Sequence, residues 1–230
     1  MIEHEPVTHH IQKHIIEVLM FNEIARFRDL RPPKVDTNLF SYHLKLLIKN
    51  DIVKKLSTGY TLSTYGIGYV DRLSVISKKV RTQPKIITMM VVQNSEGEVL
   101  LWRRKRQPYI NAWTLPYGKL HTEDESIEAA AKRELSEKLA LTNQDVRHVG
   151  DCYIHVTTNG KLLSTTLAHI FRFETDEIAI NENLVWAKPH KLSNYKLAPA
   201  VESIITRSFF NDPHFFEEFN EDWYSEEYES

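Results

Sequence analysis

The chain has 230 residues, of which 42% are hydrophobic and 26% charged, and its net charge is −2, so it is long enough for one large or two small globular domains. No run approaches the roughly 18 apolar residues of a membrane span, and the first residues lack the basic head and apolar stretch of a signal peptide, so we expect a cytoplasmic protein without a membrane partner. The single cysteine, Cys152, cannot form an internal disulfide, which fits a reducing compartment.

Residues 1–82 carry a net positive charge, with 13 Lys and Arg against 8 Asp and Glu. This moderate excess favours a polyanionic partner, although an ordinary protein surface could also carry it. Near the start, Ile11, Ile15, Val18 and Leu19 recur at helical spacing. The pattern predicts an amphipathic helix.

Two more helices and a hairpin are predicted downstream. The second helix covers residues 24–30 and is stopped by Pro32 and Pro33. The third begins at a capping residue, at position 36 or 37, and runs to about position 50 with an apolar stripe along one side. Two strand-like runs on either side of residues 58–59 then predict a β-hairpin.

The three helices and the hairpin resemble the winged helix-turn-helix domains of bacterial regulators, and we assign residues 1–80 to such a domain. The resemblance implies that the third helix enters the major groove of DNA while the hairpin lies on the backbone. Helical phase leaves several side chains off the buried stripe of this helix. These are the candidate DNA-binding residues: Asn38, Ser41, Tyr42, Lys45 and Lys49.

Two alternatives to DNA binding stay open, namely an ordinary solvated helix face and a protein-docking module. Regulators of this architecture commonly act on DNA sites with two-fold symmetry. The resemblance therefore also implies a homodimer.

A polar and basic linker over residues 74–85 separates this region from a second pattern. Beyond it, the hydrophobic periodicity predicts strands and helices that alternate, which is typical of an α/β domain over residues 84–210. The expected strands cover 86–92, 98–104, 146–156 and 162–173, and the expected helices cover 124–141 and 197–210.

Residues 211–230 form a tail that combines aromatic side chains with 8 acidic and no basic ones. Such a composition rarely buries enough apolar surface to order a segment by itself. We expect a solvated tail, with a short docking segment as the alternative.

The most specific motif of the chain surrounds the helix predicted at 124–141. It resembles the Nudix family signature, G-x5-E-x7-R-E-U-x-E-E-x-G-U, where U is a bulky apolar residue. Gly118 is followed, one residue later than in the family, by Glu125, and the family's seven-residue gap then leads to Arg133 and its neighbours. The matching run is Arg133-Glu134-Leu135-Ser136-Glu137.

The loop before this helix matches as well, because the run from Trp113 to Gly118 resembles the W-x-x-P-G-G entry of the family. The resemblance covers about residues 85–207. It implies an α/β/α sandwich with a mixed sheet, and a ligand that contains a nucleoside diphosphate.

A divalent cation such as Mg²⁺ would bridge the clustered charge of that ligand, and for this it needs converging carboxylates. Residues three apart on a helix share a face, so Glu134 and Glu137 are the candidate metal ligands. A helical wheel places Glu134 on the apolar side, where a carboxylate is costly unless a cation or hydrogen bonds satisfy it.

The resemblance implies a catalytic set of Glu134, Glu137, Arg133 and Glu125. Two interpretations of Glu125 stay open: it pairs with Arg133, or it forms a capping box with Thr122. Family enzymes often use a further glutamate as the base, and Glu177 or Glu182 would be available.

A basic run at residues 103–106 enters the loop and could bind phosphate, with a solvated strand end as the alternative. The candidate substrate-binding residues are Arg103, Arg104, Trp113 and Gly118.

The main departure from the family is Lys138, which stands where the second glutamate of the E-E pair is expected. An ammonium group there would repel an incoming cation by about 4 kcal/mol at roughly 4 Å if the effective dielectric constant is about 20. Tyr117 and Ala140 also replace family glycines. We therefore expect Mg²⁺ binding to be weakened and hydrolysis to be weak or absent.

Two functions follow from these patterns. The first is a DNA-binding regulator whose Nudix domain binds a nucleoside-diphosphate-linked metabolite; it resembles the Nudix-related regulators of NAD metabolism, which implies an ADP-ribose-like ligand. The second is an active Mg²⁺-dependent pyrophosphohydrolase that uses its first domain for docking or dimerisation. A third possibility is an adaptor that binds neither DNA nor nucleotide tightly.

Overall fold

A computed structural model describes residues 7–73, 83–142, 144–209 and 214–223. The chain divides into two compact units, residues 1–82 and 83–230. Most of the predicted linker, residues 74–82, lies outside the described residues.

None of the helices in the described part of the chain is long and apolar enough to cross a lipid bilayer.

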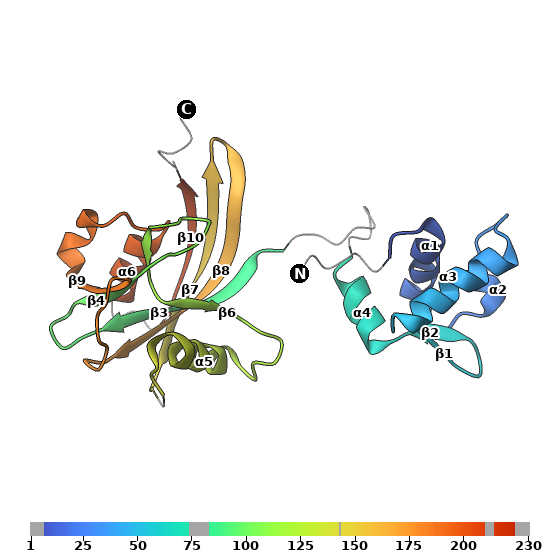
Figure 1. The fold of residues 1–230 in the computed structure, drawn as a ribbon, viewed down its shortest axis with the longest axis horizontal. Coiled ribbons are helices and arrows are strands. Elements are labelled where there is room, and N and C mark those ends of the chain that lie inside the picture. The colour runs from blue at the N-terminus through green and yellow to red at the C-terminus, as the bar shows by residue number, and fades with distance from the viewer. Residues whose placement is uncertain (1–6, 74–82, 143, 210–213, 224–230) are drawn as a thin grey trace. The chain divides into compact units, whose positions relative to one another are not determined.

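Between residues 7 and 73, the first unit contains four helices and a two-stranded antiparallel hairpin (Figure 1). In chain order they are α1 (His10–Met20), α2 (Phe27–Leu30), α3 (Thr37–Lys49), β1 (Val53–Lys55), β2 (Tyr60–Leu62) and α4 (Thr64–Asp71). The three predicted helices and the hairpin are confirmed, although the second helix begins at Phe27 and not at residue 24. Helix α4 was not predicted; it begins where the Ser63 hydroxyl accepts a hydrogen bond from the backbone N–H of Gly66 at 2.9 Å.

The core of this unit forms where α3 packs on α1. The Asp36 carboxylate starts α3 by accepting hydrogen bonds from the next backbone N–H groups, at 2.8 and 3.2 Å. The apolar stripe of α3 then faces inward, with Phe40, Leu44 and Leu47 buried among side chains of α1. The opposite face of α3 stays exposed.

The second unit is built on an eight-stranded mixed sheet. Its strands are β3 (Lys85–Gln93), β4 (Val99–Arg103), β5 (Trp113–Thr114), β6 (Tyr117–Lys119), β7 (Arg147–Thr158), β8 (Lys161–Glu174), β9 (Leu184–Ala187) and β10 (Phe215–Asp222). The order is β10-β7-β8-β3-β4-β5, with β6 also paired to β3 and β9 to β4. The β3–β8 and β10–β7 pairs are parallel and the others antiparallel.

Alternate residues of β3 face two separate cores, because successive side chains of a strand point to opposite faces. On one face Met89 packs with α6 (Val201–Ser208), and on the other Met90 packs with α5 (Ile127–Leu139). The two helices therefore cover opposite faces of the sheet (Figure 1). This arrangement confirms the expected α/β sandwich with a mixed sheet.

Cys152 lies fully buried in the core that contains α6. Burial raises the pKa of its thiol to about 12.

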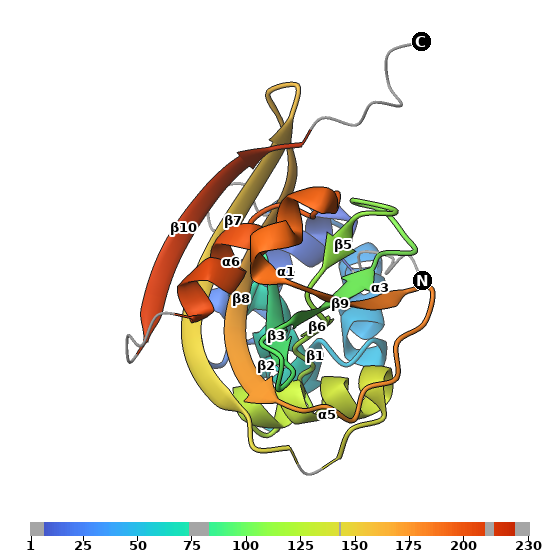
Figure 2. The same cartoon turned by 90° about the vertical axis from the view of Figure 1, so that its left-hand side faces the viewer.

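Part of the acidic tail is not a free tail. Residues 215–222 form β10, which runs parallel along the outer edge of β7 (Figure 2), whereas residues 210–213 and 224–230 lie outside the described residues. Phe215 and Phe219 pack on the sheet core, while Glu217 forms an ion pair with Arg207 of α6. The α/β unit thus extends beyond the predicted limit at residue 210, because two inward aromatic side chains compensate for an acidic edge strand.

Candidate functional site

A cavity of about 840 Å³ opens in the second unit, between the segment that follows β4, strand β6 and helix α5. This volume lies within the range of small-molecule sites. Its lining combines basic, aromatic and apolar side chains. The charged and aromatic part consists of Lys85, Trp102, Arg104, Lys105, Arg106, Tyr109, Tyr117, Lys119, His121, Glu134, Glu137 and Lys138.

Strand β6 presses directly on the most buried carboxylate of the cavity. A Cβ atom added to Gly118 would lie 1.6 Å from Cδ of Glu134, so no other residue fits at this position without displacing that side chain. The absence of a side chain at Gly118 therefore leaves the space that the Glu134 side chain occupies.

Both oxygens of Glu134 are held by cations of the protein itself. Its Oε1 lies 2.9 Å from a terminal nitrogen of Arg133, and its Oε2 lies 2.7 Å from Nζ of Lys138. Only 6% of the Glu134 side chain is exposed. The carboxylate predicted on the apolar side of the helix is thus neutralised without any added ion.

Lys138 is fixed by more than this one pair. It lies one helical turn after Glu134 and donates a hydrogen bond to the Tyr117 carbonyl oxygen. Its ammonium nitrogen also lies 5.0 Å from the ring centroid of Tyr117 and 5.7 Å from that of Trp102, within cation–π range. The side chain therefore turns into the cavity rather than out to solvent.

Arg133 pairs with Asp124, not with Glu125. Its guanidinium donates two hydrogen bonds to the Asp124 carboxylate, at 2.8 and 2.9 Å, and a third to the Lys119 carbonyl at 3.0 Å. Hydrogen bonds from Arg133 and from the backbone of His121 lower the pKa of Asp124 to about 2. The bond to Asp124 likewise raises the pKa of Arg133 above its usual value.

Both interpretations of Glu125 are wrong, because this residue is exposed and the helix is capped by Ser126. Asp124 stands at the family's five-residue gap from Gly118, so its spacing could have identified it. The extra residue therefore lies after the acidic residue and not in the loop before it.

The carboxylates do not fit a divalent cation. Among the described residues that line the cavity, Glu134 and Glu137 are the only carboxylates. Glu134 has no free oxygen, and Glu137 is 56% exposed and lies 3.4 Å from Arg133. A cation would have to displace Lys138, and the ammonium group would repel it meanwhile.

The cavity suits an anion instead. Six of the described residues that line it are Lys or Arg. Burial, together with the neighbouring Arg104 and Lys119, lowers the pKa of Lys85. Arg104 is oriented by a 2.8 Å hydrogen bond from its Nε to the Pro108 carbonyl and by stacking over Tyr109 at 5.5 Å. Lys85, Lys119 and Tyr109 were not predicted, because they meet the cavity only through strand pairing and loop folding.

Only two of the four predicted substrate-binding residues line the cavity. Arg104 and Gly118 line the cavity, whereas Arg103 and Trp113 do not. Arg103 is exposed at the end of β4, and Trp113 packs edge-on against Tyr195 at 5.8 Å. Neither Glu177 nor Glu182, the suggested bases, is part of the described lining.

In the first unit, the predicted DNA-binding residues lie on α3. Asn38, Tyr42, Lys45 and Lys49 are exposed, and Ser41 is half-buried. Their side chains thus share the face that the core leaves free.

Comparison with models of known protein families identifies the family of the second unit. The model of the NUDIX domain matches residues 83–219. The chain belongs to the NUDIX family.

Two curated relatives match shorter stretches. An RNA pyrophosphohydrolase of Hamiltonella defensa subsp. Acyrthosiphon pisum (strain 5AT) is 34% identical over 97 residues, which is 42% of this chain and 53% of the relative. An RNA pyrophosphohydrolase of Haemophilus ducreyi (strain 35000HP / ATCC 700724) is 45% identical over 58 residues, which is 25% of this chain and 27% of the relative. The chain thus spans about half or less of the length of these relatives.

Solved structures with a similar arrangement have low sequence identity to the chain. The NUDIX domain of Shewanella oneidensis NrtR complexed with ADP ribose is 18% identical, with a TM-score of 0.46, and covers 62% of this chain and 95% of its own. A MutT protein from Bacillus halodurans is 22% identical, with a TM-score of 0.48, and covers 59% of this chain and 89% of its own.

Proposed function

We propose that this NUDIX protein binds a nucleoside-diphosphate-linked metabolite without hydrolysing it appreciably. We further propose that it is a transcription regulator that binds DNA through its first unit. The observation that carries the proposal is the 2.7 Å ion pair between Lys138 and Glu134. Because the lysine supplies the charge that a metal would bring, the cavity keeps its shape and loses the cation that would activate water.

The ligand class follows from the cavity lining. Basic side chains such as Lys85, Arg104 and Lys119 suit a diphosphate, and the rings of Tyr109 and Trp102 suit a planar base or an apolar sugar face. An ADP-ribose-like compound combines these groups and is the ligand that we favour.

The proposed DNA contact is a winged-helix contact. The order of three helices, a hairpin and a further helix supports this assignment for residues 1–80. The exposed Asn38, Tyr42, Lys45 and Lys49 of α3 would face the DNA, and a homodimer would match a two-fold site.

Ligand binding is tested by a thermal-shift screen of nucleotide sugars and dinucleotides, with Mg²⁺ and with EDTA, followed by product analysis. A ligand that binds the folded state raises the melting temperature. We expect ADP-ribose to raise it equally in both buffers and to be recovered intact. Rapid Mg²⁺-dependent cleavage of any compound in the panel would refute the proposal.

The second candidate function is an active pyrophosphohydrolase, and the two RNA pyrophosphohydrolase relatives favour it. It requires Lys138 to leave Glu134 when substrate binds. In that case Lys138→Met would raise turnover, whereas our proposal expects no turnover from either protein.

A further inference from the structure

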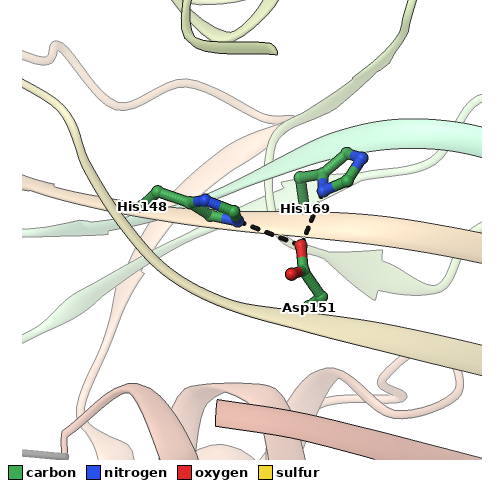
Figure 3. Close-up of side chains that lie close together, drawn as sticks. All are labelled: His148, Asp151 and His169. Carbon is green, nitrogen blue, oxygen red and sulfur yellow. Dashed lines mark hydrogen bonds and ion pairs between the residues drawn. The ribbon is translucent and has the colours of Figure 1, made fainter. Parts of the chain in front are cut away.

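Three histidines surround one aspartate on the sheet, away from the cavity. The Oδ1 atom of Asp151 lies 2.6 Å from Nδ1 of His169 and 3.0 Å from Nε2 of His148, and its Oδ2 lies 3.0 Å from Nε2 of His214. The ligand atoms of His148, Asp151 and His169 all lie within 4.8 Å of one another. Figure 3 shows His148 and His169 both directed at the same carboxylate oxygen of Asp151.

The strand register creates this convergence. Asp151 of β7 lies directly opposite His169 of β8, and His148 lies opposite Phe171, two residues further along β8. Residues three apart on a regular strand point to opposite faces. The register shift between His148 and Gly150 reverses this and brings His148 and Asp151 to the same face.

The donor set suits a borderline transition metal. Imidazole nitrogens and a carboxylate are the ligands of zinc sites, whereas Mg²⁺ prefers oxygen ligands. Four tetrahedral ligands at about 2.0–2.1 Å from zinc lie roughly 3.3 Å apart. The separations of 2.6 and 3.0 Å between Asp151 and the histidines are about 0.3–0.7 Å shorter than this, so these side chains would move apart by that amount when they take up zinc.

The surroundings hold the ligands while leaving access for an ion. The side chains of His169, Asp151 and His148 are 13%, 23% and 34% exposed, so the group is shielded but not sealed. The His148 ring stacks on Phe171 with centroids 4.9 Å apart, which orients its nitrogens. His214, at 44% exposure, stands immediately before β10, and its Nε2 lies 3.0 Å from the second oxygen of Asp151. It lies beside the group of three, close enough to move in as a fourth ligand when an ion binds.

We propose that His148, Asp151, His169 and His214 bind one Zn²⁺ ion, which fastens the edge strand β10 to β7. The ion would be bound by neutral histidines and an ionised carboxylate, and binding would exchange the present hydrogen bonds for metal–ligand bonds. This site is independent of the nucleotide cavity, so either proposal can fail without the other.

The test is a calorimetric titration of the full-length, tag-free, EDTA-treated protein with Zn²⁺. We expect one ion per chain in the wild type, and affinity at least about tenfold lower in Asp151→Asn and in His214→Gln. His155→Gln is the matched control, since His155 is half-buried on β7 outside the group and should bind zinc like the wild type. His214→Gln changes a partly exposed side chain and is therefore expected to fold.

Two further readouts separate a built site from surface binding. Co²⁺ should give the visible absorption of a tetrahedral complex in the wild type and lose it in His214→Gln. Zn²⁺ should also raise the melting temperature of the wild type more than that of His214→Gln. Absence of one-to-one zinc binding to the wild type would overturn the proposal. Zinc affinity that Asp151→Asn and His214→Gln leave unchanged would also overturn it, because the ion would then be bound by other residues.

Discussion

Lys138 lies one helical turn from Glu134 and places Nζ 2.7 Å from its Oε2, while Arg133 holds the other oxygen at 2.9 Å. A buried carboxylate that metal would otherwise stabilise is thus neutralised by two side chains of its own helix. Removing one partner of such a pair leaves a desolvated charge with less compensation.

Lys138→Met should therefore lower the free energy of unfolding by about 1–3 kcal/mol, because Glu134 loses one of its two cations in a mostly buried setting. Urea denaturation measures this change. The matched control is Lys132→Met on the same helix, where the lysine pairs with Glu128 at 2.7 Å on an exposed surface. That variant should change stability by no more than about 0.5 kcal/mol, and equal losses in both variants would contradict the assignment.

Gly118→Ala tests the close contact of β6 with α5. The new methyl group would overlap Cδ of Glu134, so we expect a loss of at least about 2 kcal/mol of unfolding free energy, together with loss of nucleotide binding. Gly68→Ala in α4 is the control, because nothing lies within 4 Å of its added Cβ. Alanine favours a helix there, so this variant should be neutral or slightly more stable. A Gly118→Ala protein as stable as wild type would show that Glu134 moves freely.

The Asp124–Arg133 pair predicts a defined acid dependence. The pKa of Asp124 is lowered from 3.8 to about 2 in the folded state, so its stabilising contribution is complete above pH 4 and is lost as the pH falls towards 2. Asp124→Asn should lower the urea midpoint at pH 5 and approach the wild type near pH 2. If the urea midpoints of the wild type and Asp124→Asn differed by the same amount at every pH from 5 to 2, the Asp124–Arg133 pair would not stabilise the fold as described.

Lys45 and Lys49 test the proposed DNA contact. Each phosphate contact contributes about 0.9 to the slope of log affinity against log salt concentration. The Lys45→Gln/Lys49→Gln double variant should reduce this slope by roughly 2 and weaken binding to all sequences alike. Lys13→Gln on α1 should leave it unchanged. Equal DNA binding by the wild type and the double variant would show that this face of α3 does not contact DNA.

Local patterns predicted much of the fold, since the main helices and strands follow hydrophobic periodicity. Short β9, the four residues from Leu184 to Ala187, carries too little periodicity to be recognised. Strand β10 was not predicted, because acidic side chains have a low propensity for strands. The segment forms a strand because it pairs with β7.

The candidate site was predicted less completely than the fold. The motif indicated Glu134 and Lys138 as neighbours, because helical spacing is local. Glu125 was considered as the partner of Arg133 because it keeps the family's seven-residue gap to Arg133, whereas Asp124 keeps the five-residue gap from Gly118; with one inserted residue the sequence satisfies only one gap at a time. The histidine group was missed altogether, since His148, His169 and His214 meet only through strand register and a bulge.

We propose above that Lys138 takes the place of a metal ion beside Glu134. Calorimetric titration of Mg²⁺ into the wild type and into Lys138→Glu tests it most directly, with Glu134→Gln as a further control. We predict no measurable Mg²⁺ binding to the wild type at millimolar concentration and clear binding to Lys138→Glu. Binding of one Mg²⁺ ion to the wild type that Glu134→Gln abolishes and Lys138→Glu leaves unchanged would contradict the account.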